Sequence, residues 1–229
     1  MNKAIGLLGG TFDPIHLGHT LPVEAISKCL LLDKVIFLPA NIPPHKACPN
    51  VSADDRATMV ELACQKNALF ECDTRELNRN GHSYTIDTLK EIAALHPKQS
   101  LYFIMGMDSL LTFTTWKDYL QILNLCNIVV NTRPNYLLPA LEDLPLATQQ
   151  LLTEYGVNAA QHVQTQTWET KSVGAIIFSQ DLYSLNKLLP VNIDISSTEI
   201  RGKLEKEESC QHLLDASVIK YIDAKKLYR

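Results

Sequence analysis

The sequence predicts an α/β protein with a central parallel sheet and helices on both faces. Three observations lead to this prediction. Apolar runs short enough for strands alternate with segments of helical apolar spacing, which is the order of βαβ units. The runs are continuously apolar, as strands buried on both faces require. Glycine or proline follows three of them, at the edge where a parallel sheet binds its ligands.

The first half of the chain alternates regularly. Strands are expected at Ala4–Leu8, Lys34–Leu38, Ala68–Cys72 and Leu101–Met105. Helices are expected at Leu21–Leu32, from Ser52 through Gln65 and at Thr85–Leu95. The second of these helices has acidic residues in its first turn, as the helix dipole prefers. The proline-rich stretch 41–50 and the polar stretch 75–83 are expected to be loops.

The second half shows a weaker pattern, above all between residues 134 and 172. Helices are expected at Tyr119–Leu125, Leu146–Tyr155, Ser197–Leu204 and Ala216–Lys225, and strands at Ile128–Asn131, Gly174–Phe178 and Val191–Ile195. A length of 229 residues suits one large domain with a full core. We therefore expect a single domain over residues 1–229, with a helical C-terminal portion, 196–229, packed on it.

Composition argues against several classes of partner. The formal net charge is −4, so no basic field is present to recruit nucleic acid or an acidic membrane. No apolar run reaches the roughly 20 residues that span a bilayer, and we expect no signal peptide before the first strand. The six cysteines lack CxxC spacing and lie mostly among apolar residues. We therefore expect free thiols in a reducing cytoplasm.

The stretch from Leu7 to Thr20, LLGGTFDPIHLGHT, carries the most distinctive chemistry. Gly9 and Gly10 end the first strand and let a ligand approach the backbone. If the chain is helical from residue 17, the side chains of His16 and His19 share one face. A strand, a glycine-rich turn and a helix N-terminus together favour an anion, because free N–H groups and the helix dipole attract negative charge. We interpret this stretch as a polyphosphate site.

Plainer interpretations exist for the same stretch. The glycines alone would suit a simple turn, and a lone histidine is most often structural. The two histidines could also bind a metal, but helix ligands usually lie four residues apart and no third ligand is obvious nearby. The stretch contains neither the Walker A sequence nor GxGxxG.

A second distinctive stretch, ISSTEIR, runs from Ile195 to Arg201. Serine followed by Glu199 before a helix is a capping-box pattern, which alone would account for Ser196 or Ser197. Arg201, however, lies about one turn inside the expected helix. From there its guanidinium could reach an anion held at the helix N-terminus.

Five further residues have both a structural and a functional interpretation. Lys46 is either an ordinary surface charge or a cation held over phosphates by a stiff proline-rich loop. Asp108 either caps a turn or binds ribose hydroxyls. Trp116 either closes the edge of the core or stacks on a flat heterocycle. Thr85 begins a helix whose free N–H groups could receive a carboxylate, and Arg133 is either a surface charge or a phosphate clamp.

The first motif matches the (T/S)-F-D-P-x-H-x-G-H signature of the nucleotidyltransferase superfamily, and the second matches its I-S-S-T-x-I-R signature. Further matches are LPANIPPHK, RELNRNGHSYTIDTL, MGMDSLLTFTTW, TRPNY and the tail LYR. With these the chain resembles the bacterial nicotinate-mononucleotide adenylyltransferases, from Lys3 to about Asn135 and from Asn192 to Arg229. The resemblance implies a Rossmann-like fold and carries no motif over to Tyr136–Leu189.

The resemblance also implies roles for individual residues. It implies that ATP is bound by Gly9, Gly10, Thr11, Phe12, His16, His19, Gly106, Asp108, Ser197, Thr198 and Arg201. Of these, His16, His19 and Arg201 are expected to act in catalysis. It implies that nicotinate mononucleotide is bound by Lys46, Thr85, Trp116 and Arg133. No metal ligand is expected from the protein, because Mg²⁺ would be held mainly by the ATP phosphates.

The implied reaction is adenylyl transfer from ATP to nicotinate mononucleotide, giving deamido-NAD and pyrophosphate in NAD biosynthesis. The substrate phosphate would attack the α-phosphorus in line, with no covalent enzyme intermediate, since both reactants are already anions. The nearest rivals, phosphopantetheine adenylyltransferases and cytidylyltransferases, lack the SYT and TTW stretches. A nucleotide-binding regulatory domain and an oligomeric scaffold are further alternatives, and the sequence leaves a homo-oligomer open.

Overall fold

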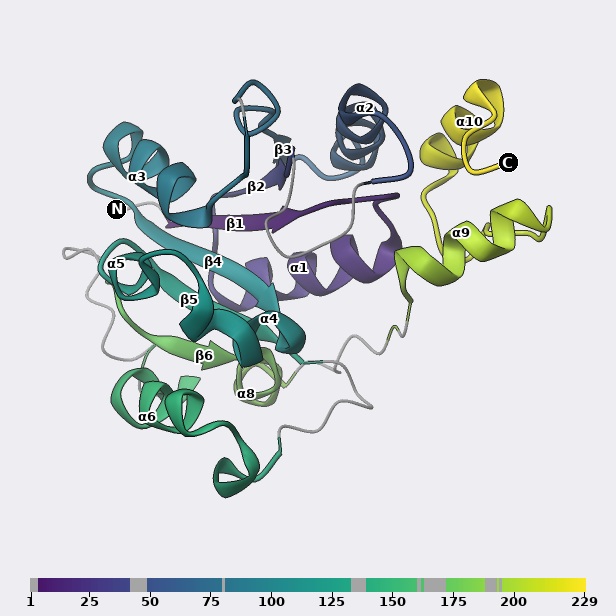
Figure 1. The fold of residues 1–229 in the computed structure, drawn as a ribbon. Helices are drawn as coiled ribbons and strands as arrows, with labels where there is room; N and C mark the ends of the chain where they lie inside the picture. Colours follow the sequence, from purple (N-terminus) through teal and green to yellow (C-terminus); the bar gives the residue numbers. More distant parts are fainter. Residues whose placement is uncertain are drawn as a thin grey trace.

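The computed structural model describes residues 4–41, 49–79, 81–132, 139–159, 162, 172–187, 193 and 195–229. Its centre is a six-stranded sheet in the order β3-β2-β1-β4-β5-β6, and every neighbouring pair is parallel (Figure 1). The strands are β1 (Ala4–Gly10), β2 (Lys34–Pro39), β3 (Phe70–Cys72), β4 (Ser100–Gly106), β5 (Asn127–Asn131) and β6 (Ile176–Phe178). The predicted parallel α/β fold is confirmed.

The strand order reverses beside β1. The chain runs outward from β1 through β2 to β3, and then returns to place β4 on the other side of β1. Gly10 pairs with Pro39 at the end of β2, and β4 ends at Gly106. At such a reversal the connections that leave neighbouring strands diverge, which opens a crevice at the carboxyl edge of the sheet. The glycines of the first motif lie at this edge.

Alternate side chains of each strand enter two separate apolar cores. In β4, Tyr102 and Ile104 belong to one core, whereas Phe103 and Met105 belong to the other. Both faces of the sheet are therefore buried, which explains the continuous apolar runs. The helices packed on the first core are α1 (Leu17–Cys29), α2 (Ala53–Cys64), α8 (Ser179–Leu185), α9 (Ser197–Glu205) and α10 (Ala216–Lys225). Those on the second are α3 (Thr85–Leu95), α4 (Met107–Thr112), α5 (Tyr119–Leu123) and α6 (Leu146–Tyr155).

Some elements differ from the sequence-based expectation. Helix α1 begins at Leu17 rather than Leu21, because its first turn consists of motif residues without apolar spacing. Helix α4 was not predicted, since it follows β4 directly and the two read as one apolar run. Helix α8 was not predicted either. The strand expected at Val191–Ile195 is wrong for Ile193 and Ile195, which lie outside any strand, and its other residues lie outside the described ranges.

Within these ranges, no helix combines the length and the apolar character needed to cross a lipid bilayer. Free thiols are present at Cys29, Cys64, Cys72, Cys126 and Cys210, whereas Cys48 is not among the described residues. Burial raises the pKa of Cys64 and of Cys72 to about 12. Both thiols therefore stay protonated and weakly nucleophilic near neutral pH.

Candidate functional site

Two adjoining cavities lie at the carboxyl edge of the sheet, where the strand order reverses. One has a volume of about 310 Å³ and the other about 530 Å³. They share a wall formed by Gly9, Gly10, Thr11, Phe103, Asp108, Ser109 and Trp116. Two ligands seated in them would therefore meet over the end of β1.

The larger cavity collects the residues that the sequence assigned to ATP. Its lining includes Gly9, Gly10, Thr11, Phe12, His16, His19, Gly106, Asp108, Ser197, Thr198 and Arg201. The smaller cavity is lined by Thr85 and Trp116, two of the residues assigned to the mononucleotide. The other two, Lys46 and Arg133, lie outside the described residues. We call the larger cavity the phosphate side and the smaller one the pyridine side.

The turn after β1 is shaped by Phe12, whose side chain is buried. Its backbone lies in the left-handed region, with φ of 49°, which is uncommon for a residue with a side chain. A Cβ atom at Gly10 would come within 2.9 Å of the Phe12 ring. Glycine at this position therefore lets the ring pack under the turn while the backbone above it stays open to a ligand.

His16 and His19 lie together at the start of α1. Their rings stack with centroids 3.7 Å apart, and the edge of Phe12 packs on His19 at 5.1 Å. The backbone N–H of His16 donates to Nδ1 of His19 at 3.2 Å. Because Nδ1 accepts this bond, a neutral His19 carries its proton on Nε2. The hydrogen bond thus makes Nε2 a donor on a residue that lines the same cavity as Arg201.

Gly18, between the two histidines, allows a close contact with the second motif. A Cβ atom there would lie 3.0 Å from Nδ1 of His16 and 3.5 Å from Cβ of Ile195. A larger residue would push either the imidazole or the start of the ISSTEIR segment out of place. Glycine at position 18 therefore brings the two motifs together.

Helix α9 begins beside the start of α1 (Figure 1). Ser196 is its N-cap, because the hydroxyl accepts from the backbone N–H of Glu199 at 3.1 Å. The hydroxyl of Ser197 instead donates to the carbonyl oxygen of Pro14 at 3.0 Å. Arg201 donates to the carbonyl of Asp13 at 2.7 Å and to the hydroxyl of Thr198 at 3.2 Å. The second motif therefore holds the turn of the first one while its cation faces the cavity.

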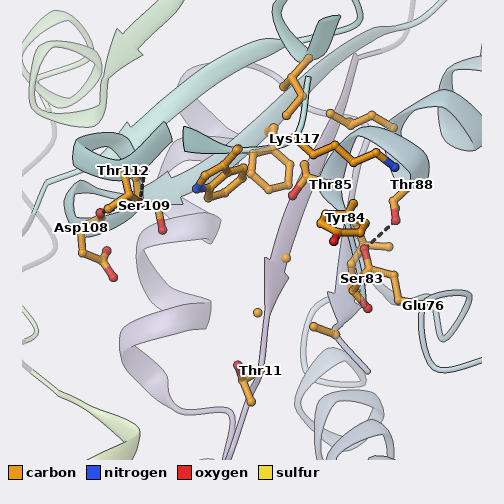
Figure 2. A pocket seen from close by; sticks show the side chains of 18 residues that line it. Thr11, Glu76, Ser83, Tyr84, Thr85, Thr88, Asp108, Ser109, Thr112 and Lys117 are labelled. Carbon is orange, nitrogen blue, oxygen red and sulfur yellow. Dashed lines mark hydrogen bonds between the residues drawn. The ribbon is translucent and has the colours of Figure 1, made fainter. Parts of the chain in front are cut away.

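The pyridine side is apolar on one wall and polar on the other (Figure 2). Trp116 packs edge-on against Phe103 and Phe113, with ring centroids 6.2 and 5.5 Å apart, so its orientation is fixed. Across the cavity, Thr85 begins α3. Nζ of Lys117 lies 4.6 Å from the centre of the Tyr84 ring and 3.1 Å from Asp87. An aromatic plate thus faces a helix start and a cation.

Comparisons with known proteins agree with this geometry. Residues 7–203 match the cytidylyltransferase-like family. The chain is 39% identical over 230 residues to the nicotinate-nucleotide adenylyltransferase of Salmonella typhimurium, covering 100% of both chains. A probable nicotinate-nucleotide adenylyltransferase of Psychromonas ingrahamii is also 39% identical, over 99% of this chain and 98% of the relative. The chain belongs to the nicotinate-nucleotide adenylyltransferase family.

The fold of this adenylyltransferase family member is also found in solved structures. The nicotinic acid mononucleotide adenylyltransferase of Plasmodium falciparum, complexed with NaAD, superposes with a TM-score of 0.66. The match covers 99% of this chain and 98% of that one, at 18% identity. Sequence identity this low supports the likeness of the fold alone.

Arg56 lines neither cavity but holds loops beside them, and sequence reasoning missed it. It lies in α2, is 1% exposed, and its Nη1 donates to the carbonyl oxygens of Thr11 and Ala40, both at 2.7 Å. Its Nη2 donates to the carbonyl of Asn41 at 3.3 Å. Burial lowers the pKa of Arg56, and the Asp13 carboxylate opposes that shift. One guanidinium therefore joins the loops that follow β1 and β2.

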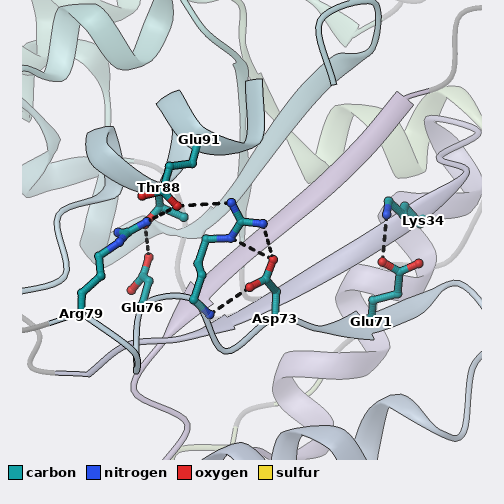
Figure 3. A network of polar contacts seen from close by, with 8 residues as sticks. Lys34, Glu71, Asp73, Glu76, Arg79, Thr88 and Glu91 are labelled. Atoms are coloured by element: carbon teal, nitrogen blue, oxygen red, sulfur yellow. Dashed lines mark hydrogen bonds and ion pairs between the residues drawn. The ribbon is translucent and has the colours of Figure 1, made fainter. Parts of the chain in front are cut away.

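A polar network includes Glu76 and Thr88, two residues that line the pyridine side (Figure 3). The buried carboxylate of Glu76 accepts from the hydroxyl of Thr88 at 2.7 Å, and Arg79 donates to the same hydroxyl at 2.8 Å. Arg79 also lies 2.7 Å from Glu91. Burial raises the pKa of Glu76, although hydrogen bonds from Thr88 and Ser83 oppose the shift. These contacts fix the first turns of α3 against the loop before it.

Proposed function

We propose that the chain transfers the adenylyl group of ATP to nicotinate mononucleotide, giving deamido-NAD and pyrophosphate in NAD biosynthesis. The observation that carries the proposal is the pair of adjoining cavities with a common wall. One contains the anion-binding groups of both motifs, and the other contains an aromatic plate facing a helix start. The Salmonella typhimurium relative, 39% identical over its full length, is named for this activity.

On the phosphate side, several donors would converge on the triphosphate. His19, Thr198 and Arg201 all line this cavity, and Nε2 of His19 and the guanidinium of Arg201 would be donors to phosphate oxygens. A planar guanidinium can bind two phosphate oxygens at once. The dipole of α1, whose N-terminal turn lines this cavity, adds a field that favours negative charge. Gly106 and Asp108 would lie at the adenosine of ATP, where a carboxylate can bind ribose hydroxyls.

On the pyridine side, the face of Trp116 would stack on the pyridine ring, and the free N–H groups near Thr85 would receive its carboxylate. Nicotinamide lacks that charge, and its NH₂ group would face donors without an acceptor. A site built for a carboxylate therefore disfavours the amide. We infer a preference for the nicotinate substrate on these grounds.

The reaction would proceed by attack of the mononucleotide phosphate on the α-phosphorus of ATP, in line with the departing pyrophosphate. One P–O bond forms and one breaks, and no enzyme nucleophile is needed because the attacking oxygen is already anionic. Holding the two reactants in line could contribute about 7–11 kcal/mol. Each donor aimed at the developing charge could add about 3–4 kcal/mol. His16, His19 and Arg201 would supply those donors.

Mg²⁺ belongs to the proposal as a companion of ATP. Among the residues that the structure describes, no three His, Cys, Asp or Glu side chains form a group able to hold a metal ion. Mg²⁺ is commonly held by substrate phosphates and water with one or two carboxylates. We assign no protein carboxylate to the ion, because Asp108 is placed at the ribose, and the ATP phosphates would supply most of its ligands. When bound, the ion would neutralise charge on the departing pyrophosphate. We also propose that the protein functions in the reducing cytoplasm expected from its free thiols.

The direct test follows pyrophosphate release from ATP and Mg²⁺ with one acceptor at a time. Nicotinate mononucleotide should give rapid release, and nicotinamide mononucleotide should give a kcat/KM at least tenfold lower. Phosphopantetheine and a cytidylyl acceptor with CTP test the related activities. Release with either of these, but not with nicotinate mononucleotide, would overturn the proposal. Equal kcat/KM for the two mononucleotides would contradict the preference alone.

A further inference from the structure

The carboxylate of Asp13 is an anion at a site that must attract anions. It lies in the turn of the first motif, lines the phosphate side and is 5% exposed. Oδ2 accepts from the backbone N–H of Asn50 at 2.8 Å, and Oδ1 accepts from the hydroxyl of Tyr228 at 2.7 Å. The residues in the second bond are 215 positions apart in the sequence. A neutral hydroxyl from the far end of the described chain thus caps this carboxylate.

The chain after α10 is shaped to deliver that hydroxyl. Lys226 has φ of 54° and ends the helix in the left-handed conformation, and the N–H of Leu227 returns to the carbonyl of Ile222 at 3.0 Å. This reversal turns Tyr228 back toward the first motif. Burial and the bond to Asp13 raise the pKa of the Tyr228 hydroxyl, so it stays a donor. Tyr221, on the same helix, donates instead to Asp55 of α2 at 2.8 Å.

Arg201 has two acceptors on Asp13 within reach. Its Nη1 donates to the backbone carbonyl at 2.7 Å, while the carboxylate Oδ2 lies 3.9 Å away. If the carboxylate lost a donor, its unmet hydrogen-bonding capacity would attract the nearby guanidinium, because a charge-assisted pair is stronger than a bond to a neutral carbonyl. That movement would withdraw Arg201 from a phosphate in the cavity.

We propose that Tyr228 is a positioning residue for ATP: by capping the Asp13 carboxylate, its hydroxyl leaves Arg201 free to bind the triphosphate. This inference rests on the proposed adenylyl transfer. Tyr228 itself is absent from the lining of either cavity. It acts on the substrate through Asp13 and Arg201, and it therefore affects ATP and not the mononucleotide.

The test compares Tyr228→Phe with Tyr221→Phe, because both remove one hydroxyl that α10 or the turn after it donates to a carboxylate. We expect Tyr228→Phe to raise the KM for ATP, and the Kd of a non-hydrolysable ATP analogue by calorimetry, by roughly five- to tenfold, the size of one ordinary hydrogen bond. The KM for nicotinate mononucleotide should stay within twofold. Tyr221→Phe should change none of these constants.

Two results would overturn the inference: unchanged ATP affinity in Tyr228→Phe, or an equal rise in both KM values with a lowered Tm, which marks a merely structural tyrosine. Failure of the proposed function would give a different result, because the wild-type chain would then release no pyrophosphate. Calorimetry would still compare the binding of the ATP analogue by Tyr228→Phe and Tyr221→Phe.

A double-mutant cycle tests the route through Asp13. In an Asp13→Asn background no anion competes for Arg201, so adding Tyr228→Phe should weaken binding of the ATP analogue by less than about twofold. The same loss in both backgrounds would show that the tyrosine does not act through the carboxylate. Tm measured for all four proteins ensures that folded chains are compared.

Discussion

The two cavities of this site are assembled in different ways. The phosphate side is held by contacts between remote parts of the chain, such as Ser197 with Pro14 and Tyr228 with Asp13, which are 183 and 215 positions apart. The pyridine side is held by nearer contacts, such as Thr88 with Glu76 and Lys117 with Asp87, which are 12 and 30 positions apart.

This difference has a chemical counterpart. The phosphate side presents backbone groups and cations whose positions depend on the whole tertiary structure. The pyridine side presents one aromatic plate and one helix start, supported by a local network. Substitutions on the pyridine side should therefore alter the choice of mononucleotide. Those on the phosphate side should alter turnover, and they should also alter stability where the substituted side chain joins remote segments.

The strongest test of the phosphate side is His19→Ala. Removing a donor aimed at the developing charge should lower kcat by two or more orders of magnitude, as in deletions from oxyanion holes. The Tm should change little, because His19 is only half-buried and lines the cavity. Steady-state kinetics and a thermal melt measure both. His212→Ala, at an exposed position, is the matched control. Turnover near the wild-type rate would remove His19 from the mechanism.

Arg56→Met should show how far the phosphate side depends on distant packing. The substitution leaves three carbonyl oxygens without their donor, and we expect a loss of roughly 2–4 kcal/mol in the free energy of unfolding. The KM for ATP should rise as well, because the turn after β1 loosens. Urea denaturation and kinetics measure these effects. Arg56→Lys should be intermediate, since one ammonium cannot reproduce the fork of the guanidinium. A stable variant with normal kinetics would contradict this account.

On the pyridine side, Trp116→Ala should raise the KM for nicotinate mononucleotide by roughly tenfold, in line with the usual worth of stacking on an aromatic side chain. The KM for ATP should change less, although Trp116 belongs to the shared wall. Trp116→Phe keeps a ring and should lose less affinity. If the two KM values rise equally in Trp116→Ala, the division into two sides is wrong.

The smallest effect is expected for Glu76→Gln, seen in the pH dependence of stability. Burial raises the pKa of Glu76 in the folded state, so the folded chain binds a proton that the unfolded chain releases. The free energy of unfolding of the wild type should therefore fall, relative to the variant, as pH rises from about 4.5 through the folded pKa. A single titrating group limits this slope to at most ~1.4 kcal/mol per pH unit. Parallel curves for the two proteins would contradict this expectation.

Much of this molecule could be predicted from the sequence, because the deciding signals are local. The continuous apolar runs indicated the parallel strands. The spacing of residues such as Gly10 and His19 predicted that they lie together, and both line one cavity. Ser196 and Ser197 were left as alternatives for the cap of α9, and only the structure separates them. Their hydroxyls point to different partners, one within the helix and one across to Pro14.

The remaining features depend on contacts that no local pattern records. Arg56 resembles an ordinary helix charge in the sequence, yet it is buried because two loops turn their carbonyls toward it. In the sequence, Tyr228 is an aromatic residue near the end of the chain and Asp13 is a residue of a turn. Neither position indicates that the two side chains are hydrogen-bonded. Burial and pairing over such distances follow from the strand order, which periodicity does not specify.

The reversal of strand order beside β1 has a consequence for folding kinetics. β1 pairs with β2 early in the sequence but also with β4, whose register joins Ala4 to Ser100. Long loops must close before these strand pairings can add stabilising contacts, and the entropy lost on closing them slows folding. The contact of Tyr228 with Asp13 closes a still longer loop. ATP should therefore recognise only the last species on the folding pathway, and its binding would report the completion of the native state.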